Sequence, residues 1–202
     1  MCSSRGRGQV VIFDFDGTIV SGDSFGMFAL HARGLMRYWA ALLRNFGRLA
    51  AWKLGLADPS SVKEHLFSSL YAGMAVGELE EYGRSFSTVV ERNLCGRIDA
   101  MLRSHIAAGD KVYIVSASPG LWIRPWAATR GGVTVVATEA GVSAEGIITG
   151  RFATANCRGY EKLRRIMSAC PDLREHRVKV VTDNASDAPL MDIADEVVFV
   201  GK

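Results

Sequence analysis

Short runs of apolar residues, rich in valine, recur along this chain of 202 residues and are separated by longer segments with helical periodicity. Nearly continuous apolar runs are typical of parallel strands covered on both faces, and the intervening segments supply the covering helices. The pattern therefore predicts an α/β fold with a doubly wound parallel sheet. The predicted strands are residues 10–15, 111–115, 133–137, 178–181 and 196–200, and the predicted core helices are residues 97–108, 119–130, 160–169 and 186–194.

The gap between the first two predicted strands is anomalous. It spans about ninety residues, whereas a crossover helix needs only about a dozen. Within it, amphipathic patterns predict helices, and Pro59 followed by Ser61-x-x-Glu64 is typical of a helix start. We expect an all-helical cap at residues 22–93, inserted into a core formed by residues 1–21 and 94–202. The predicted cap helices are residues 35–54, 62–72 and 78–94, and residues 141–150 predict a small hairpin in the core.

The charge balance and the cysteines limit the functional classes. The chain has 24 basic and 21 acidic residues and a formal net charge of +3, so a nucleic-acid partner is not expected. Residues 1–8 are polar and the apolar run that follows is too short for a signal peptide, so we expect no export. The cysteines form no C-x-x-C pair, which fits reduced thiols in a cytosol. They are Cys2, Cys95, Cys157 and Cys170.

The motif Asp14-Phe15-Asp16-Gly17-Thr18 ends the first apolar run. A lone Asp-Gly pair is commonly only a turn. Two carboxylates at the end of a buried strand, however, need a compensating cation, and a metal ion is the simplest candidate. Side chains alternate along a strand, so both aspartates can face one side while the phenylalanines pack on the other. An EF-hand calcium loop is excluded, because its sixth and twelfth positions would be Ile19 and Phe25.

Three further polar segments follow predicted strands or begin predicted helices. Ser116-Ala117-Ser118 can be a helix N-cap or can hold an oxyanion with its hydroxyl and the following amides. Lys162 can be a solvated lysine of a first helical turn. The segment from Asp183 to Asp187 closes another strand on two carboxylates, of which Asp187 can simply favour a helix start. Because the carboxyl ends of parallel strands meet at one edge of a sheet, these segments can also form one site.

The order of these four segments resembles the motifs of the haloacid dehalogenase superfamily of phosphohydrolases, which have a Rossmann-like core. The predicted insertion resembles the helical cap of the phosphoserine-phosphatase-like subclass, known as subclass IB. The resemblance implies a magnesium-dependent phosphatase. The chain departs from the usual pattern at Thr182, where family members commonly have glycine, and at Asn184, which is often serine or glycine.

The resemblance also implies a role for each motif residue. Asp14 would attack phosphorus and form an aspartyl phosphate, and Asp16 would act as general acid and then general base. The carboxylates of Asp14 and Asp183, with the main-chain carbonyl of Asp16, would bind Mg²⁺. The phosphate would be held by Thr18, Ser116, Ala117 and Lys162, and Asn184 and Asp187 would support these groups.

The longest predicted cap helix has an unusual surface. Arg33, Arg37, Arg44 and Arg48 are spaced by four, seven and four residues and so form one stripe, while most other positions are apolar. Either the helix is buried against its partners, with the arginines in water or facing the substrate phosphate, or it lies on an anionic lipid surface. We do not expect it to cross the membrane, because each cation at the bilayer centre costs about 2.5 to 3.5 kcal/mol.

A second resemblance concerns the substrate. Asp23-Ser24-Phe25-Gly26, the apolar cap helix and Asn156-Cys157-Arg158-Gly159 look like bacterial phosphatidylglycerophosphate phosphatases of the same superfamily. We therefore expect a phosphatase acting on a small organic phosphate or on a lipid headgroup phosphate, located in the cytoplasm or peripherally at the inner face of the cell membrane. The alternatives are a phosphoserine-type metabolite phosphatase, a phosphotransferase or mutase, and a catalytically idle module that binds phosphate or membrane. Asp23, Arg37 and Arg44 are the candidate substrate contacts in the cap.

Overall fold

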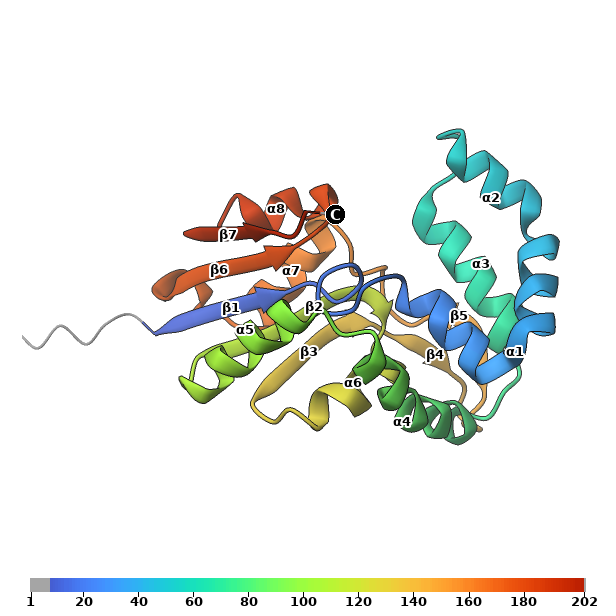
Figure 1. Ribbon diagram of the computed structural model, residues 1–202. Helices are drawn as coiled ribbons and strands as arrows, with labels where there is room; N and C mark the ends of the chain where they lie inside the picture. The colour runs from blue at the N-terminus through green and yellow to red at the C-terminus, as the bar shows by residue number, and fades with distance from the viewer. Residues whose placement is uncertain (1–7, 202) are drawn as a thin grey trace, which may run out of the picture.

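Five parallel strands form the central sheet of the computed structural model, in the order β3-β2-β1-β6-β7 (Figure 1). The model describes residues 8–201, so Cys2 and nearly all of the segment behind the export prediction lie outside the described residues. The predicted doubly wound parallel sheet is confirmed. The strands are β1 (Gln9–Phe13), β2 (Lys111–Pro119), β3 (Val133–Thr138), β6 (Arg177–Thr182) and β7 (Glu196–Phe199).

Alternate residues of the central strand β1 pack against helices on opposite faces of the sheet. Val11 and Phe13 belong to a buried cluster that includes residues of α5 and α6, whereas Val10 and Ile12 belong to a second cluster with residues of α7. Burial of both faces explains why the strands are apolar at consecutive positions. The core helices are α5 (Gly96–Ala107), α6 (Gly120–Ala128), α7 (Tyr160–Ala169) and α8 (Ala188–Met191), with 3-10 turns η1 (Leu173–Glu175) and η2 (Ala185–Asp187).

A helical segment separates β1 from α5 in the chain and forms the cap at one end of the sheet (Figure 1). The chain enters and leaves it at adjacent points, because the Ser21 amide donates a hydrogen bond to the Asn93 carbonyl at 2.8 Å. The hairpin of β4 and β5 packs against α3 through β5. The elements of this region are α1 (Ser24–Arg44), α2 (Phe46–Lys53), α3 (Pro59–Tyr71), α4 (Val76–Arg92), β4 (Ala140–Val142) and β5 (Ile148–Phe152).

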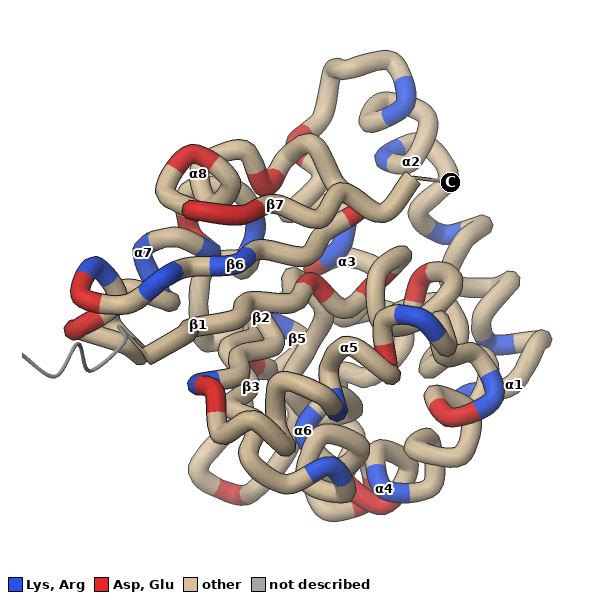
Figure 2. The backbone as a smooth tube through the Cα atoms, turned by 60° about the vertical axis from the view of Figure 1, so that its left-hand side comes forward, with Lys and Arg blue, Asp and Glu red and all other residues tan. Residues whose placement is uncertain are grey.

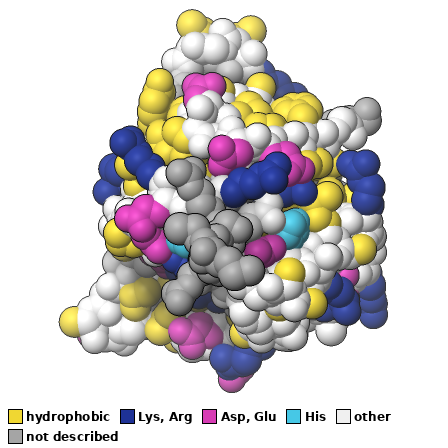
Figure 3. Space-filling view, turned by 90° about the vertical axis from the view of Figure 1, so that its left-hand side faces the viewer, with side chains coloured by type: hydrophobic (Ala, Val, Ile, Leu, Met, Phe, Trp, Pro, Cys, Tyr) yellow, Lys and Arg dark blue, Asp and Glu magenta, His cyan; other side chains and the backbone are white. Residues whose placement is uncertain are grey.

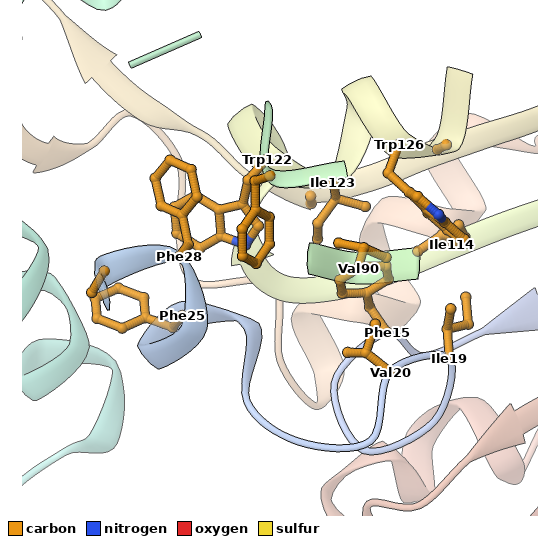
Figure 4. Close-up of a cluster of buried hydrophobic side chains, with 14 of the residues drawn as sticks. Phe15, Ile19, Val20, Phe25, Phe28, Val90, Ile114, Trp122, Ile123 and Trp126 are labelled. Atoms are coloured by element: carbon orange, nitrogen blue, oxygen red, sulfur yellow. The ribbon is translucent and has the colours of Figure 1, made fainter. Parts of the chain in front are cut away.

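The base of the cap is anchored in the core (Figure 4). Phe28 of α1 stacks on Trp122 of α6 with ring centroids 4.4 Å apart, and the Trp122 indole N–H donates to the Ser24 hydroxyl at 3.1 Å. Helix α4 also approaches α6 closely at Gly83, where an added Cβ would lie 2.5 Å from the Leu121 carbonyl oxygen. The start of α1 and all of α4 therefore share one interior with the sheet.

The predicted continuous helix at 35–54 is wrong. Helix α1 begins earlier, at Ser24, and has a kink at Gly34, whose φ of 74° and ψ of 170° are not helical. It ends at Arg44, because the Asn45 side chain donates to the Ala41 carbonyl at 2.9 Å and a new helix, α2, follows. We call residues 35–56, the part of the cap beyond the kink, the arm.

Two helix starts also differ from the prediction. Helix α3 begins at Pro59 and is capped by Asp58, whose carboxylate accepts from the Ser61 amide at 2.8 Å, so Ser61 is not the N-cap. Glu64 instead binds the hairpin, accepting from the Arg151 side chain at 2.9 Å. The predicted helix at 186–194 is shorter in the structure, since η2 precedes the four residues of α8.

Candidate active site

A cavity of about 380 Å³ lies beyond the carboxyl ends of the strands, between the sheet and the cap. Its floor includes Asp14, Asp16, Lys162 and Asp187, which come from three separate motifs. The register places Phe13 of β1 beside Val181 of β6, so the chain segments that follow these two residues leave the sheet as neighbours. The prediction that the motifs meet at one sheet edge is thus confirmed for these four residues.

Lys162 joins two carboxylates at the bottom of the cavity. Its Nζ lies 2.8 Å from Asp14 Oδ1 and 2.8 Å from Asp187 Oδ2, and all three side chains are buried. Burial alone would lower the pKa of Lys162, but the attraction of both aspartates outweighs it and raises that pKa. Lys162 is therefore a charged group of the site rather than a solvated surface lysine.

Asp14 is held in place by its own backbone and by Lys162. Its amide donates to the Val181 carbonyl at 2.9 Å, and its Oδ1 accepts from the Phe15 amide at 2.8 Å. Burial raises the pKa of Asp14 to about 6, while the positive charge of Lys162 acts in the opposite direction. A cation bound beside Asp14 would favour the ionised carboxylate.

Asp16 lies beside Asp14 but has different partners. Its Oδ1 accepts from the Ser24 amide at the start of α1 at 2.7 Å, and its Oδ2 accepts from the Ser118 hydroxyl at 2.6 Å. Both aspartates line the cavity, whereas Phe13 and Phe15 are fully buried in the core, as the alternation predicted. Asp16 thus connects the end of β2 with the first turn of the cap.

Gly17 allows Asp183 to approach the first motif. A Cβ at Gly17 would lie 2.1 Å from Asp183 Oδ2, and the φ of 76° also favours glycine there. The fully buried Thr18 fixes Asp183, since its hydroxyl accepts from the Asp183 amide at 3.0 Å and donates to Asp183 Oδ1 at 3.4 Å. Thr18 was predicted to bind phosphate, but its hydroxyl is engaged with Asp183 and it does not line the cavity.

The other predicted site residues lie at different depths. Ala117 lines the cavity, whereas Ser116 is fully buried behind it and its Oγ accepts from the Ser118 amide at 3.0 Å. Asn184 lines the cavity and starts η2 by accepting from the Ser186 amide at 2.9 Å. Thr182, where glycine was the common residue, donates to Asp187 Oδ2 at 2.8 Å and so helps to orient that carboxylate.

In the cap, one of three predicted substrate contacts lines the cavity. Asp23 does so while it caps α1, accepting from the Gly26 amide at 3.0 Å, and burial raises its pKa. Arg37 and Arg44 are exposed on the arm and are not among the residues that line the cavity, so the structure does not bring these two predicted contacts to the site. The face of the arm that packs inward instead carries Ala41 and Asn45.

Lys63 of α3 lines the cavity, although the sequence did not single it out. Its Nζ donates to the Ala117 carbonyl at 3.2 Å and lies 3.4 Å from the Ser118 hydroxyl, inside the cavity. Burial lowers the pKa of Lys63, although the nearby aspartates oppose this shift. It also lies 5.5 Å from the centre of the Phe25 ring. No local motif marks this lysine; only the docking of α3 on the core brings it here.

The residues present can supply oxygen ligands to a hard divalent ion. No cluster of three or more His, Cys, Asp or Glu side chains with metal-binding geometry occurs within residues 8–201. The predicted set needs only the carboxylates of Asp14 and Asp183 with the Asp16 carbonyl, because Mg²⁺ keeps several waters. Within the described residues, the buried Asp187 Oδ1 has no hydrogen-bond partner, so it is available to accept a hydrogen bond from a magnesium-bound water. The chemical types of these donors therefore suit magnesium, while Asp183 itself is held beside Gly17 and is not among the residues that line the cavity.

Comparison with known proteins identifies the family. A model of the haloacid dehalogenase-like hydrolases matches residues 11–192. Protein CicA of Caulobacter vibrioides is 32% identical over 199 residues, covering 96% of this chain and 87% of CicA. A solved Bordetella pertussis Tohama I protein of unknown function has a TM-score of 0.80 and 21% identity, covering 96% of this chain and 90% of that one. A substrate-bound phosphoserine phosphatase has a TM-score of 0.65 and 16% identity, covering 98% of this chain and 89% of that one. The match over most of its length shows that this chain belongs to the haloacid dehalogenase-like hydrolases.

Proposed function

We propose that this hydrolase is a magnesium-dependent phosphatase that cleaves phosphomonoesters through an aspartyl phosphate on Asp14. The observation that carries the proposal is the arrangement at the cavity floor, where a buried carboxylate is held 2.8 Å from the Lys162 ammonium. A second carboxylate, that of Asp16, is separated from Asp14 by Phe15 in the sequence and lines the same cavity. A fixed nucleophile, a neighbouring acid and a buried cation are what phosphoryl transfer requires.

In the proposed reaction, a carboxylate oxygen of Asp14 attacks phosphorus as the bond to the leaving oxygen breaks. Asp16, in its acid form, gives a proton to that oxygen, and the alcohol departs. A water then attacks the aspartyl phosphate and passes a proton to Asp16, which releases inorganic phosphate and restores both groups. Lys162 and the amides after Ser116 would neutralise charge on the phosphoryl oxygens.

Bound Mg²⁺ would supply a positive charge that offsets the repulsion between the aspartates and an anionic phosphate. Asp14, Asp183 and the Asp16 carbonyl would hold it. The collision that a side chain at position 17 would make with Asp183 supports this proposal, because glycine there keeps the second carboxylate close. We also propose that residues 22–93 act as a cap on a core of residues 1–21 and 94–202.

The cavity walls favour an organic phosphate with an apolar neighbourhood. Phe25, Leu49, Trp52 and Leu66 line it together with the Lys63 ammonium. We propose that the substrate is a small organic phosphate or a lipid headgroup phosphate of the phosphatidylglycerophosphate type. A phosphoserine-type metabolite is the second candidate. The presence of both the Asp23 carboxylate and the Lys63 ammonium in the cavity lining favours this candidate, since a zwitterion would find a partner for each of its charges.

The test is release of phosphate from an aryl phosphate by the purified chain, with Mg²⁺ and after chelation, and with the Asp14→Asn variant as the control. We expect turnover only with Mg²⁺ and with Asp14 present. Equal turnover by Asp14→Asn would refute the proposal, and absence of turnover in every condition would favour an idle phosphate-binding module. Added alcohols would yield new phosphate esters if the enzyme were a phosphotransferase.

A substrate panel then separates the two candidates. Phosphatidylglycerophosphate in mixed micelles and phosphoserine are compared by kcat/KM, and Lys63→Met is measured beside wild type. We expect the lipid phosphate to be the better substrate; a preference for phosphoserine that disappears in Lys63→Met would favour the metabolite. No described helix is long and apolar enough to cross a membrane. The exposed apolar side chains and arginines of the arm lead us to propose a cytoplasmic protein that contacts the inner face of the membrane peripherally.

A further inference from the structure

The arm exposes an apolar surface that the other residues of the described range 8–201 do not cover. Helix α2, all of which the structure describes, buries none of its residues. Leu35, Trp39 and Leu43 recur every fourth position and form one exposed stripe, with side chains between 55% and 73% exposed. Contiguous exposed apolar residues of this kind mark an interaction site. The surface comprises Leu35, Met36, Trp39, Leu43, Phe46, Trp52, Leu54 and Leu56.

The charges of this region have a single sign. Residues 24–57 contain five of the basic residues and none of the 21 acidic residues of the chain, so the remainder of the chain is slightly acidic. Arg37 and Arg44 lie seven positions apart on one exposed stripe of α1, and Arg48 and Lys53 are exposed on α2. Figure 2 shows only basic segments along α2, whereas the opposite end of the molecule, seen in Figure 3, displays side chains of both signs.

An exposed apolar stripe beside an all-basic stripe complements one occupant, the surface of a bilayer that contains anionic lipids. Apolar side chains can enter the headgroup region while the arginines meet the negative surface potential. A second copy of the arm would bring like charges together and is disfavoured. We propose that residues 35–56 form a membrane-docking arm that holds the enzyme on anionic lipid.

The arm also connects the bilayer with the cavity. Leu49 and Trp52 line the cavity, and Trp52 is 44% exposed, so the apolar surface of the arm continues into the cavity wall. A lipid can therefore keep its apolar part against Leu49 and Trp52 while its headgroup phosphate enters the cavity. This part of the inference rests on the proposed function, whereas the docking itself does not.

The docking is tested by flotation with vesicles, and activity on a soluble aryl phosphate is measured for every variant to show that the fold is intact. Vesicles of phosphatidylcholine with about one-third phosphatidylglycerol are compared at low salt with pure phosphatidylcholine. The charge variant is Arg37→Gln/Arg44→Gln/Arg48→Gln. Its matched control is Arg84→Gln/Arg92→Gln/Arg97→Gln, which removes three exposed arginines outside the arm.

We expect wild type to float with the anionic vesicles only. Each arginine near an anionic surface strengthens binding roughly fivefold, so the charge variant should bind about a hundredfold more weakly while the control binds as wild type does. Leu43→Ser/Phe46→Ser should also lose roughly tenfold or more. Both arm variants should hydrolyse the aryl phosphate at the wild-type rate, because none of the changed residues lines the cavity.

Several results would overturn the docking proposal. These are failure of wild type to float at low salt, equal binding to neutral vesicles, equal losses in the charge variant and its control, or a dimer in lipid-free solution that the apolar variant abolishes. The Asp14→Asn variant separates this test from the proposed function. If it floats as wild type does, docking is independent of turnover, and a wild type that floats but hydrolyses no phosphomonoester would refute only the proposed function.

Discussion

Replacement of Lys162 by methionine tests the electrostatics of the cavity floor. Methionine keeps much of the side-chain volume but leaves the carboxylates of Asp14 and Asp187 buried without their common cation. Removal of one partner of a buried ion pair typically costs 3–5 kcal/mol, because the remaining charge is uncompensated. We therefore expect Lys162→Met to lower the free energy of unfolding by about 3 kcal/mol or more at pH 8, measured by urea denaturation.

The loss should depend on pH in a defined direction. Burial already raises the pKa of Asp14 to about 6 with the lysine present, and loss of the lysine raises that pKa further. A carboxyl group whose pKa is higher in the folded state than in the unfolded state destabilises the fold when it is ionised, and this penalty disappears as the pH falls below the folded-state pKa. The difference between variant and wild type should therefore shrink from pH 8 to pH 5.5.

Two matched variants separate electrostatics from packing. Lys162→Met/Asp187→Asn removes one of the two carboxylate charges, so it should regain at least half of the lost stability. Neither variant should show phosphatase activity, because both lack the lysine proposed to hold the phosphoryl oxygens. Lys53→Met, an exposed lysine of α2, should change stability by less than about 0.5 kcal/mol. The reasoning is refuted if Lys162→Met unfolds at the wild-type urea concentration, or if the double variant is no more stable than the single one.

Three further predictions concern backbone contacts and surface charge. Gly83→Ala should destabilise the protein by about 1–3 kcal/mol, measured by urea denaturation, because the added Cβ would collide with the Leu121 carbonyl. Gly77→Ala on the same helix has open space and should not destabilise it. Equal effects of the two substitutions would contradict the close contact between α4 and α6. Gly17→Ala should abolish phosphatase turnover, because the added Cβ would displace the Asp183 carboxylate. A kcat equal to that of wild type would contradict this close approach. Arg164 and Arg165 hold the pKa of Glu161 at about 2. The stability that ionised Glu161 gives the fold is therefore complete above the ordinary carboxyl pKa and is lost as the pH falls towards 2. Glu161→Gln should therefore be less stable than wild type by about 1 kcal/mol or less at pH 7, and a constant difference down to pH 3 would contradict this pair.

The parts of the fold that were predictable depend on local patterns. Strands buried on both faces are apolar at successive positions, and polar residues follow where the chain leaves the sheet, so the strands and most of the cavity floor could be inferred. Asp14, Asp16, Lys162 and Asp187 converge because parallel strands place their carboxyl ends along one edge. The resemblance to a known family, confirmed by comparison, depended on the same segments.

The cap could be predicted less well, because its outcome depends on long-range packing. Periodicity placed Arg37 and Arg44 on a common stripe but could not tell which way that stripe faces, and it faces solvent. Nor does a helical pattern reveal that Gly34 adopts a positive φ within it. Lys63 lies in an ordinary amphipathic helix, and its approach to Ala117 arises only from the packing of that helix against the core.

The stacking of Phe28 on Trp122 and the kink at Gly34 separate a part of the cap that is packed into the core from the arm, which is not. Substitutions before Gly34 disturb the interior that also supports the sheet, so they are costly whatever the substrate. Within the arm, residues 35–56, only Ala41 and Asn45 are buried, so exchanges at its other positions are expected to cost little stability. New substrate preferences in descendants of this protein are therefore expected to arise by change within residues 35–56, where Leu49 and Trp52 line the cavity, while the reaction chemistry is inherited unaltered.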